Sequence, residues 1–266
     1  MFGCGNVLVS LYAKKHWPSK LPKELSFNSK DLKLAKKIAL LELKKGATNS
    51  GVLVRLTGQS GSGKTTQLLP AAGSYFEKKN LKPIIIRAQE LAKYHPYYEE
   101  ILKKYGEAEI RKRTDDFATI LMYLVVKNLT KKHYDLIIDV SFVSPKIEML
   151  LMMMTKKYKE RLFLMMALPL ELSEKLLEAR KWRHDKKMEK EFYDATEKSL
   201  KFYGKYFPEI HIVIWGFDKP EPIYGGEIRD AYEIWKKEIN RKIENEKKIT
   251  IKEGVESKIE YMKNMI

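Results

Sequence analysis

The residues best suited to chemistry lie in one short stretch, Gly58–Thr65, which reads GQSGSGKT. Its glycines let the backbone turn several N–H groups inward, so that they can bind the phosphate oxygens of one ligand. Lys64 adds a positive charge for the same oxygens, and the hydroxyl of Thr65 is a suitable ligand for Mg²⁺. This P-loop pattern predicts binding of ATP or GTP together with Mg²⁺. The predicted nucleotide-binding residues are Gly58, Gln59, Ser60, Gly61, Ser62, Gly63, Lys64, Thr65 and Thr66.

The segments on either side of this stretch have the pattern that a P-loop needs. Residues 52–57 form a β-branched apolar run, VLVRLT, which predicts a strand, and residues 64–79 are expected to form a helix. The phosphates would then lie at the N-terminus of a helix, where free backbone N–H groups and the helix dipole favour anions.

A carboxylate at the end of another predicted strand could complete the metal site. The apolar run within residues 134–140, YDLIIDV, leads to Asp139. Ligands of open α/β sheets gather at the carboxyl ends of the strands, so we expect Asp139 beside Thr65, with both residues directed toward Mg²⁺. The competing interpretation is an exposed aspartate at the end of a strand, with no metal.

A basic turn later in the chain could close over the transferred phosphoryl group. Residues 178–187 read EARKWRHDKK, in which Arg180 and Arg183 share one helix face. Guanidinium groups in such a lid would neutralise phosphoryl oxygens during transfer. A solvated run of charges is the alternative interpretation.

The order of the predicted elements indicates an α/β fold. Strands are expected at residues 52–57, 83–87, 134–140, 161–168 and 211–215, and helical patterns lie between them. Strands joined by crossover helices form a parallel sheet that is covered on both faces, which is the three-layer arrangement of P-loop NTPases and kinases.

Three regions are expected along the chain. Residues 1–50 would form a basic, helical N-terminal extension, since apolar positions recur at helical spacing over residues 31–43. Residues 51–218 would form the kinase core, with the lid near 178–190. Prolines and glycines then indicate a linker, and residues 219–266 would contain this linker and a charged helical extension with few apolar positions.

The composition indicates a globular, cytoplasmic protein. A hydrophobic fraction of 44% is sufficient for a large core, and the single cysteine, Cys4, cannot form an internal disulfide. The apolar runs are too short to cross a membrane, so no membrane partner is expected. The net charge of +16 would attract polyanions, which makes nucleic acid a partner hypothesis, although the lysines are spread along the whole chain.

The order of these motifs resembles that of the zeta toxin family, the kinases of toxin–antitoxin systems. The resemblance extends roughly from Val52 to Ile214 and rests on the P-loop, on His95-Pro96 after the second strand, and on the strand that ends at Asp139. It implies an ATP-dependent transfer of the γ-phosphoryl group to a hydroxyl of a small acceptor, which in the family is UDP-N-acetylglucosamine. It also implies an antitoxin-like protein partner.

On the acceptor side this sequence departs from the family pattern. The resemblance places Gln89 where the family has the aspartate that acts as base, and Arg87 where it has a second aspartate. A neutral amide cannot accept a proton, so Glu90 becomes the candidate base, although neighbouring side chains of an extended chain point in opposite directions. Met122 stands near the position of a family carboxylate that contacts the sugar nucleotide. The implied substrate-binding residues are Gln89, His95 and Ser141, and the predicted catalytic residues are Lys64, Glu90, Arg180 and Arg183.

Three functions therefore stay open. The first is a kinase of a nucleotide sugar or another small acceptor. The second is a degenerate ATP- or GTP-binding protein that acts through a partner, which the replacement of the family's base by Gln89 favours. The third is a nucleic-acid-directed kinase or ATPase, which the positive charge favours.

Overall fold

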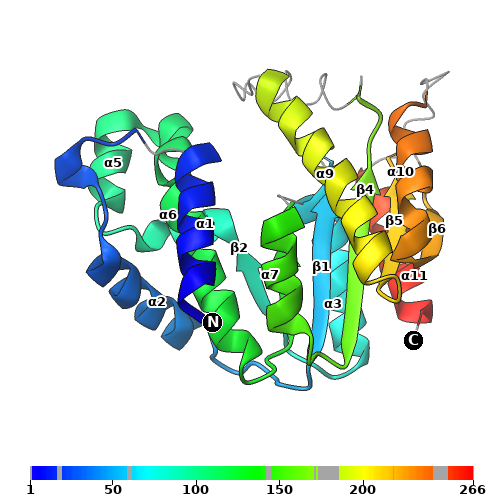
Figure 1. Ribbon diagram of the computed structural model, residues 1–266. Coiled ribbons are helices and arrows are strands. Elements are labelled where there is room, and N and C mark those ends of the chain that lie inside the picture. The colour runs from blue at the N-terminus through cyan, green and yellow to red at the C-terminus, as the bar shows by residue number, and fades with distance from the viewer. Residues whose placement is uncertain are drawn as a thin grey trace.

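A six-stranded sheet with the strand order β2-β3-β1-β4-β5-β6 forms the centre of the computed structural model (Figure 1). The structure describes residues 2–16, 20–58, 62–141, 145–170, 172, 186–217, 219–241 and 251–265. The strands are β1 (Val52–Gly58), β2 (Ile84–Arg87), β3 (Leu136–Asp139), β4 (Glu160–Ala167), β5 (His211–Gly216) and β6 (Pro222–Glu227).

The strand register brings the ends of three strands together. β1 and β3 pair in parallel with Leu56 opposite Asp139, and β2 and β3 pair in parallel with Arg87 opposite Asp139. β4 and β5 continue the parallel sheet, and β6 pairs with β5 in the antiparallel direction. The predicted α/β fold is confirmed, with an antiparallel strand added at one edge.

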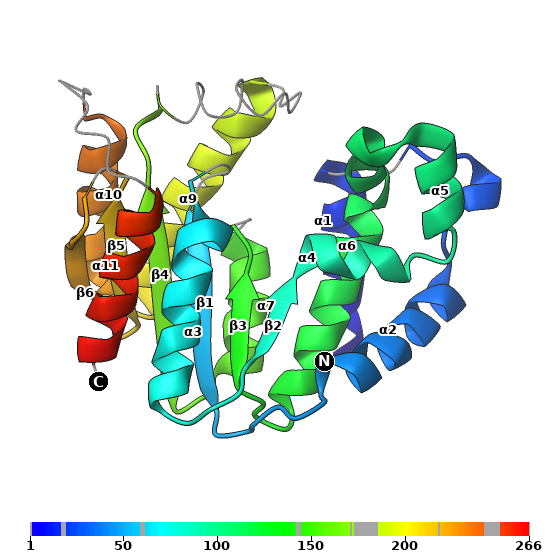
Figure 2. The ribbon, with the colours of Figure 1, turned by 180° about the vertical axis from the view of Figure 1, so that it is seen from behind.

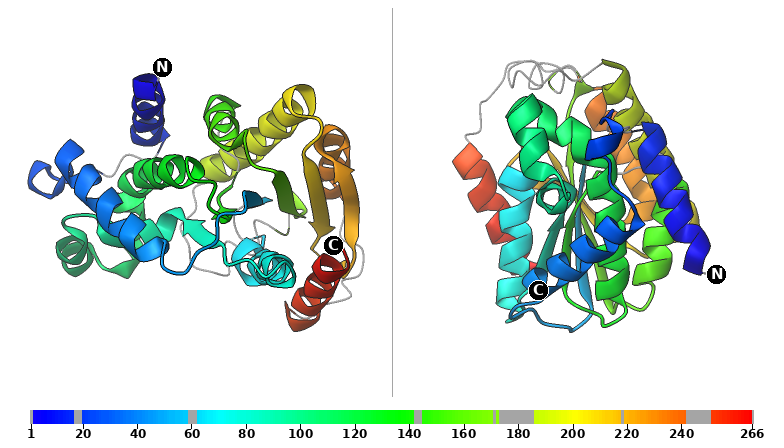
Figure 3. Two further views of the ribbon diagram at one scale, coloured as in Figure 1. Left: turned by 90° about the horizontal axis from the view of Figure 1, so that it is seen from below. Right: turned by 90° about the vertical axis from the view of Figure 1, so that its left-hand side faces the viewer.

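Helices cover both faces of this sheet. The helices α7, α9 and α10 lie on one face (Figure 1), and α3 and α11 lie on the other (Figure 2). α6 stands beside β2 with α1 and α2 packed against it, and the view from below shows these layers (Figure 3). The helix bounds are α1 (Phe2–His16), α2 (Ser29–Leu43), α3 (Leu69–Lys78), α4 (Ala88–Leu91), α5 (Tyr98–Tyr105), α6 (Glu107–Thr130), α7 (Pro145–Thr155), α9 (Lys186–Tyr206), α10 (Ala231–Ile239) and α11 (Ile251–Asn264). Short helical turns are η1 (Lys23–Leu25), η2 (Lys64–Leu68), η3 (Ala92–Tyr94) and η4 (Ile228–Asp230).

Alternation along the strands supplies a core on each face. Val54 and Leu56 of β1 pack against the α3 side, where Phe76 and Met262 are also buried. Side chains of β4 and β5 that point the other way pack with Tyr203 of α9 and Trp235 of α10. A sheet buried on both faces explains why its strands read as nearly continuous apolar runs.

The C-terminal region differs from the expectation. Residues 222–227, which the prolines and glycines indicated as a linker, form β6. Pro222 and the two glycines are compatible with this position because an edge strand pairs on one side only. α10 and α11 also bury more apolar surface than expected, since Trp235 is 1% exposed and Met262 is fully buried. These helices therefore belong to the core layers.

One buried polar network was not predicted. Arg55 of β1 donates hydrogen bonds to both carboxylate oxygens of Glu148 on α7, and the Nη2–Oε1 distance is 3.0 Å. The hydroxyl of Tyr203 on α9 donates to the same carboxylate at 2.5 Å. Arg55 is 3% exposed and Glu148 is fully buried. Burial and the charge of Glu148 raise the pKa of Tyr203 well above its ordinary value, so its hydroxyl stays a donor.

Within the described part of the chain, none of the helices combines the length and the apolar character needed to cross a membrane.

Candidate functional site

The P-loop begins where β1 ends, and two of its glycines are required by the backbone. Gly58 has a φ of 123°, and a Cβ atom at this position would lie 2.5 Å from the carbonyl oxygen of Met166. Gly63 has a φ of 90°, which side-chain-bearing residues rarely adopt. The predicted nucleotide-binding residues 59–61 lie outside the described residues. The described ends of the loop have the tight backbone path that the glycine pattern predicts.

Lys64 and the following residues stand at the N-terminus of a helix. η2 starts at Lys64 and continues directly into α3, so the backbone N–H groups of its first turn face the loop. The ammonium group of Lys64 donates to the carbonyl oxygen of Gly58 at 3.0 Å, which holds it across the loop. Thr66 donates from its hydroxyl to the carbonyl oxygen of Gly63 at 3.3 Å. Together these groups provide the positive end of a helix and an ammonium group for an anion.

Thr65 and Asp139 meet at the carboxyl ends of β1 and β3. The hydroxyl of Thr65 donates to Oδ2 of Asp139 at 3.0 Å, so the two residues lie side by side as expected, and their role in holding a metal stays a prediction. Among the described residues, no cluster of three or more His, Cys, Asp or Glu side chains could hold a metal by itself. The hydroxyl and the carboxylate fit Mg²⁺, which usually takes one or two protein ligands and completes its shell with water and phosphate oxygens.

Arg87, which the resemblance placed only at the position of a family aspartate, contacts this site directly. Its Nε lies 3.4 Å from Oδ2 of Asp139, and its Nη2 lies 3.4 Å from the hydroxyl of Thr65. The parallel register explains the contact, because Arg87 is the last residue of β2 and lies opposite Asp139 on β3. The signal in the sequence was that one predicted strand ends in an arginine and the following predicted strand ends in a carboxylate.

Glu90 lies closer to this cluster than an extended chain would allow. The expectation of an extended segment is wrong, because α4 begins at Ala88, immediately after β2. The helical turn brings the carboxylate of Glu90 to 2.5 Å from Nη1 of Arg87, while its side chain stays 53% exposed. Gln89 is also exposed in this turn. The role of Glu90 as a base stays a prediction.

His95 is buried behind this turn rather than open to solvent. It is 3% exposed, and its ring packs edge-on against Phe27 and Phe117, with a centroid distance of 4.8 Å to Phe117. Its Nδ1 accepts a hydrogen bond from the backbone N–H of Tyr97 at 3.2 Å. Burial lowers the pKa of His95 to about 4, so the ring is neutral at pH 7. Its assignment to substrate binding stays a prediction.

The depressed pKa of His95 predicts a loss of stability in mild acid. Below the ordinary value of 6.5 the unfolded chain takes up a proton, whereas the folded chain does so only near a pH of about 4. The free energy of unfolding should therefore fall between these values, by at most about 1.4 kcal/mol per pH unit from this group. Urea denaturation at pH 7 and pH 5 measures the loss. His95→Asn keeps an acceptor near the Nδ1 position but does not titrate. The free energy of unfolding of this variant should therefore fall less between pH 7 and pH 5 than that of the wild type. An equal fall would contradict the assignment of the pH dependence to His95.

Fewer contacts are described for the remaining predicted site residues. The carbonyl oxygen of Ser141, two residues after Asp139, accepts from Nη2 of Arg55 at 3.5 Å. Arg180 and Arg183 lie outside the described residues, so their predicted role in a lid stays a prediction.

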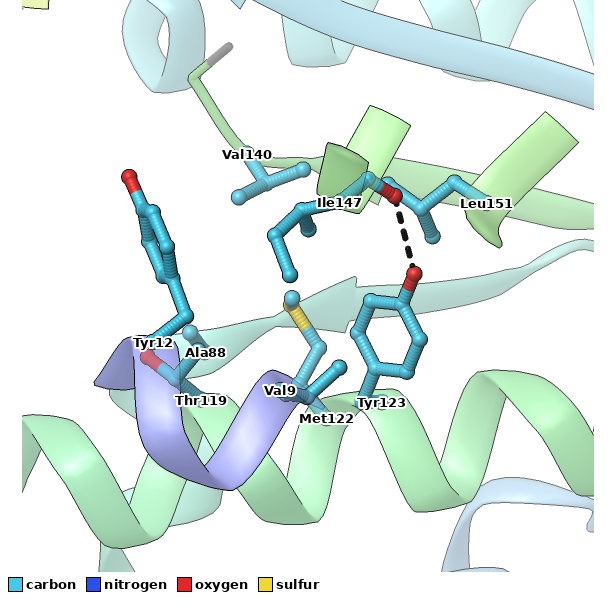
Figure 4. Close-up of a pocket in the computed structure, with 9 residues that line it drawn as sticks. All are labelled: Val9, Tyr12, Ala88, Thr119, Met122, Tyr123, Val140, Ile147 and Leu151. Carbon is cyan, nitrogen blue, oxygen red and sulfur yellow. Dashed lines mark hydrogen bonds between the residues drawn. The ribbon is translucent and has the colours of Figure 1, made fainter. Parts of the chain in front are cut away.

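A small apolar cavity of about 40 Å³ lies beside the carboxyl ends of β2 and β3. Ala88 and Val140, which follow those two strands, form part of its wall, and Met122 of α6 projects into it (Figure 4). Val9 and Tyr12 of α1 also line the cavity. The other lining residues are Thr119, Tyr123, Ile147 and Leu151. The sheet edge next to the Thr65–Asp139 pair is thus bordered by apolar side chains, and α1 had no predicted place there.

Comparisons with known proteins agree with this geometry. The family model described as Zeta toxin matches residues 39–202, which is more than half of the chain and includes the P-loop and Asp139. A solved structure of the PezAT chromosomal toxin–antitoxin system of Streptococcus pneumoniae is similar in fold, with a TM-score of 0.63 and 19% identity over 92% of this chain and 98% of that one. The search of curated proteins found no match. The extent of the family match, together with a P-loop whose Thr65 meets Asp139, shows that this chain belongs to the zeta toxin family of P-loop kinases.

Proposed function

We propose that this protein is a cytoplasmic, ATP-dependent phosphotransferase that moves the γ-phosphoryl group to a hydroxyl of a small acceptor, such as a nucleotide sugar. The observation that carries the proposal is the 3.0 Å contact between Thr65 and Asp139 at the start of the P-loop helix. Phosphoryl transfer depends mainly on positioning and on neutralising the charge of the phosphoryl oxygens, and the P-loop has the groups for both tasks.

On the nucleotide side, each residue has a distinct role in this proposal. The N–H groups at residues 58–66 bind phosphate oxygens, and Lys64 neutralises part of their charge. Thr65 and Asp139 hold Mg²⁺, which supplies charge neutralisation at the β- and γ-phosphates when it is bound. Arg180 and Arg183 would approach the same group from the lid. GTP is an alternative nucleotide for this site.

On the acceptor side, Glu90 is the proposed base. Its exposed carboxylate is 2.5 Å from Nη1 of Arg87, which in turn contacts Asp139 and Thr65, so Glu90 is joined to the predicted metal site through Arg87. Gln89, His95 and Ser141 are the proposed acceptor-binding residues. Because the transition state is loose, a modest base is sufficient for transfer.

Transfer from labelled ATP tests this function directly. We expect label on one of a panel of acceptors that includes nucleotide sugars, nucleosides and oligonucleotides with a free 5′-hydroxyl. Glu90→Gln should lower the rate by about 100-fold, as loss of a general base does, whereas Gln89→Ala should weaken acceptor binding but retain transfer at saturating acceptor. Absence of label on every acceptor would contradict the kinase assignment.

A second candidate is a nucleotide-binding module without transfer activity. It is favoured by the apolar surroundings of Met122 and by Gln89, which cannot act as a base. Such a module would bind ATP without turnover and would act through a protein partner. The similarity in fold to the toxin–antitoxin structure supports an antitoxin-like partner in either case. Nucleotide binding measured together with turnover separates the two candidates.

A further inference from the structure

Arg87 occupies an unusual position for a cation in a nucleotide site. Its guanidinium lies beside the hydrogen-bonded pair that is suited to hold a metal, with Nη2 3.4 Å from the hydroxyl of Thr65 and Nε 3.4 Å from Oδ2 of Asp139. Its third neighbour is Glu90, at 2.5 Å from Nη1. The side chain is 18% exposed, so these contacts orient it within the site rather than on the open surface.

Two features keep the guanidinium in place. The strand register puts Arg87 opposite Asp139, and the turn into α4 returns Glu90 to the same side chain. An arginine held on both sides loses less conformational entropy when it binds a further anion. A guanidinium has five N–H groups, and the contacts with these three neighbours use at most three of them. At least two therefore remain for another acceptor.

The anion within reach is the one that the P-loop binds. Thr65 is part of the P-loop and follows Lys64 directly, so Nη2 of Arg87 lies next to the residues that hold the phosphate end of the nucleotide. A guanidinium binds phosphate oxygens through paired N–H groups, with stronger bonds than neutral donors form. It also partly neutralises Asp139, which weakens the attraction of that carboxylate for a divalent cation.

We propose that Arg87 is a built-in cation of the nucleotide site, which binds the terminal phosphate oxygens and gives the protein substantial affinity for a nucleoside triphosphate without a divalent cation. The inference depends on the proposed nucleotide binding, but it concerns only the binding step. It assigns to Arg87 part of the charge neutralisation that Mg²⁺ would otherwise supply before transfer.

The test measures equilibrium binding of ATP by calorimetry, once with EDTA and once with excess Mg²⁺. The wild-type protein should bind ATP in EDTA with an affinity within about tenfold of that in Mg²⁺. Arg87→Gln should lower the affinity in EDTA by at least about tenfold, the effect of losing a charged hydrogen bond, and should change the affinity in Mg²⁺ much less. Tripolyphosphate, which has no base or sugar, should show the same pattern.

Arg161→Gln is the matched control. Arg161 lies near the amino end of β4 and pairs with the exposed Glu209 at 2.9 Å. This substitution therefore removes the same charge as Arg87→Gln, but at the other end of the strands. Its affinity for ATP should equal that of the wild type in both conditions. If Arg87→Gln fails to fold in a thermal melt, Arg87→Met, which keeps much of the apolar stem, should give the same selective loss.

The results that would overturn the inference are specific. Equal losses with and without Mg²⁺, or no loss in either condition, would show that Arg87 does not replace the metal. Wild-type protein that binds ATP only with Mg²⁺ would also refute it, while leaving the proposed kinase intact. Absence of ATP binding under both conditions would instead refute the nucleotide site itself, and the inference with it.

Discussion

Replacing Lys64 by alanine is expected to lower the affinity for ATP by at least about 100-fold in the presence of Mg²⁺. The ammonium group lies across the loop, 3.0 Å from the carbonyl oxygen of Gly58, at the N-terminus of the P-loop helix. Hydrogen bonds from a charged donor contribute about 1.5–3 kcal/mol each, and this ammonium can form more than one with phosphate oxygens. Calorimetric titration with ATP measures the loss.

Lys132→Ala provides a control that lowers the net charge by the same amount as Lys64→Ala. Lys132 is exposed in the turn after α6, on the side of the sheet where β3 begins, so its loss should leave the affinity unchanged. The free energy of unfolding of Lys64→Ala should remain close to that of the wild type, since the side chain is partly exposed. If Lys64→Ala bound ATP as well as Lys132→Ala does, the P-loop would not be the phosphate site.

Glu148→Ala is expected to destabilise the fold by about 3–5 kcal/mol, the usual cost of leaving a buried charge without its partner. Arg55 is 3% exposed and lies on the central strand β1, where water cannot readily replace the lost carboxylate. The substitution also removes the acceptor of Tyr203 on α9. Urea denaturation followed by circular dichroism gives the change in the free energy of unfolding.

Two further variants separate the ion pair from a general effect of truncation. In Arg55→Met combined with Glu148→Leu both charges are absent, so much of the stability should return. Glu209→Ala removes the acid of the exposed pair with Arg161 and should cost at most about 1 kcal/mol. A double variant less stable than Glu148→Ala would contradict the assignment of the loss to an unpaired charge.

The fold could be predicted because its signals are local. The apolar runs identified the parallel strands, the helical spacing over residues 31–43 identified α2, and the GQSGSGKT stretch identified the turn between β1 and its helix. The side chain of Asn28 accepts from the backbone N–H groups of Lys30 and Asp31, which is the capping that starts this helix. The meeting of Thr65 and Asp139 followed from one rule about the carboxyl ends of parallel strands.

The features that were missed depend on which segments become neighbours. The contact between Arg87 and Asp139 requires the strand order β2-β3-β1, which no local pattern specifies. Arg55 and Glu148 lie 93 residues apart, and in sequence Arg55 is simply a polar residue within an apolar strand. Edge position likewise decided that a segment with Pro222 could form β6. In each case the information lies in long-range packing.

The cavity wall that α1 contributes and the P-loop come from different parts of the chain, so one can change without the other. Val9 and Tyr12 close the small apolar cavity, yet α1 precedes the segment that the Zeta toxin family model matches. Substitutions along this helix would reshape the cavity wall while the P-loop keeps its sequence. This helix outside the matched segment can therefore change the space beside the carboxyl ends of β2 and β3 without any change in the P-loop.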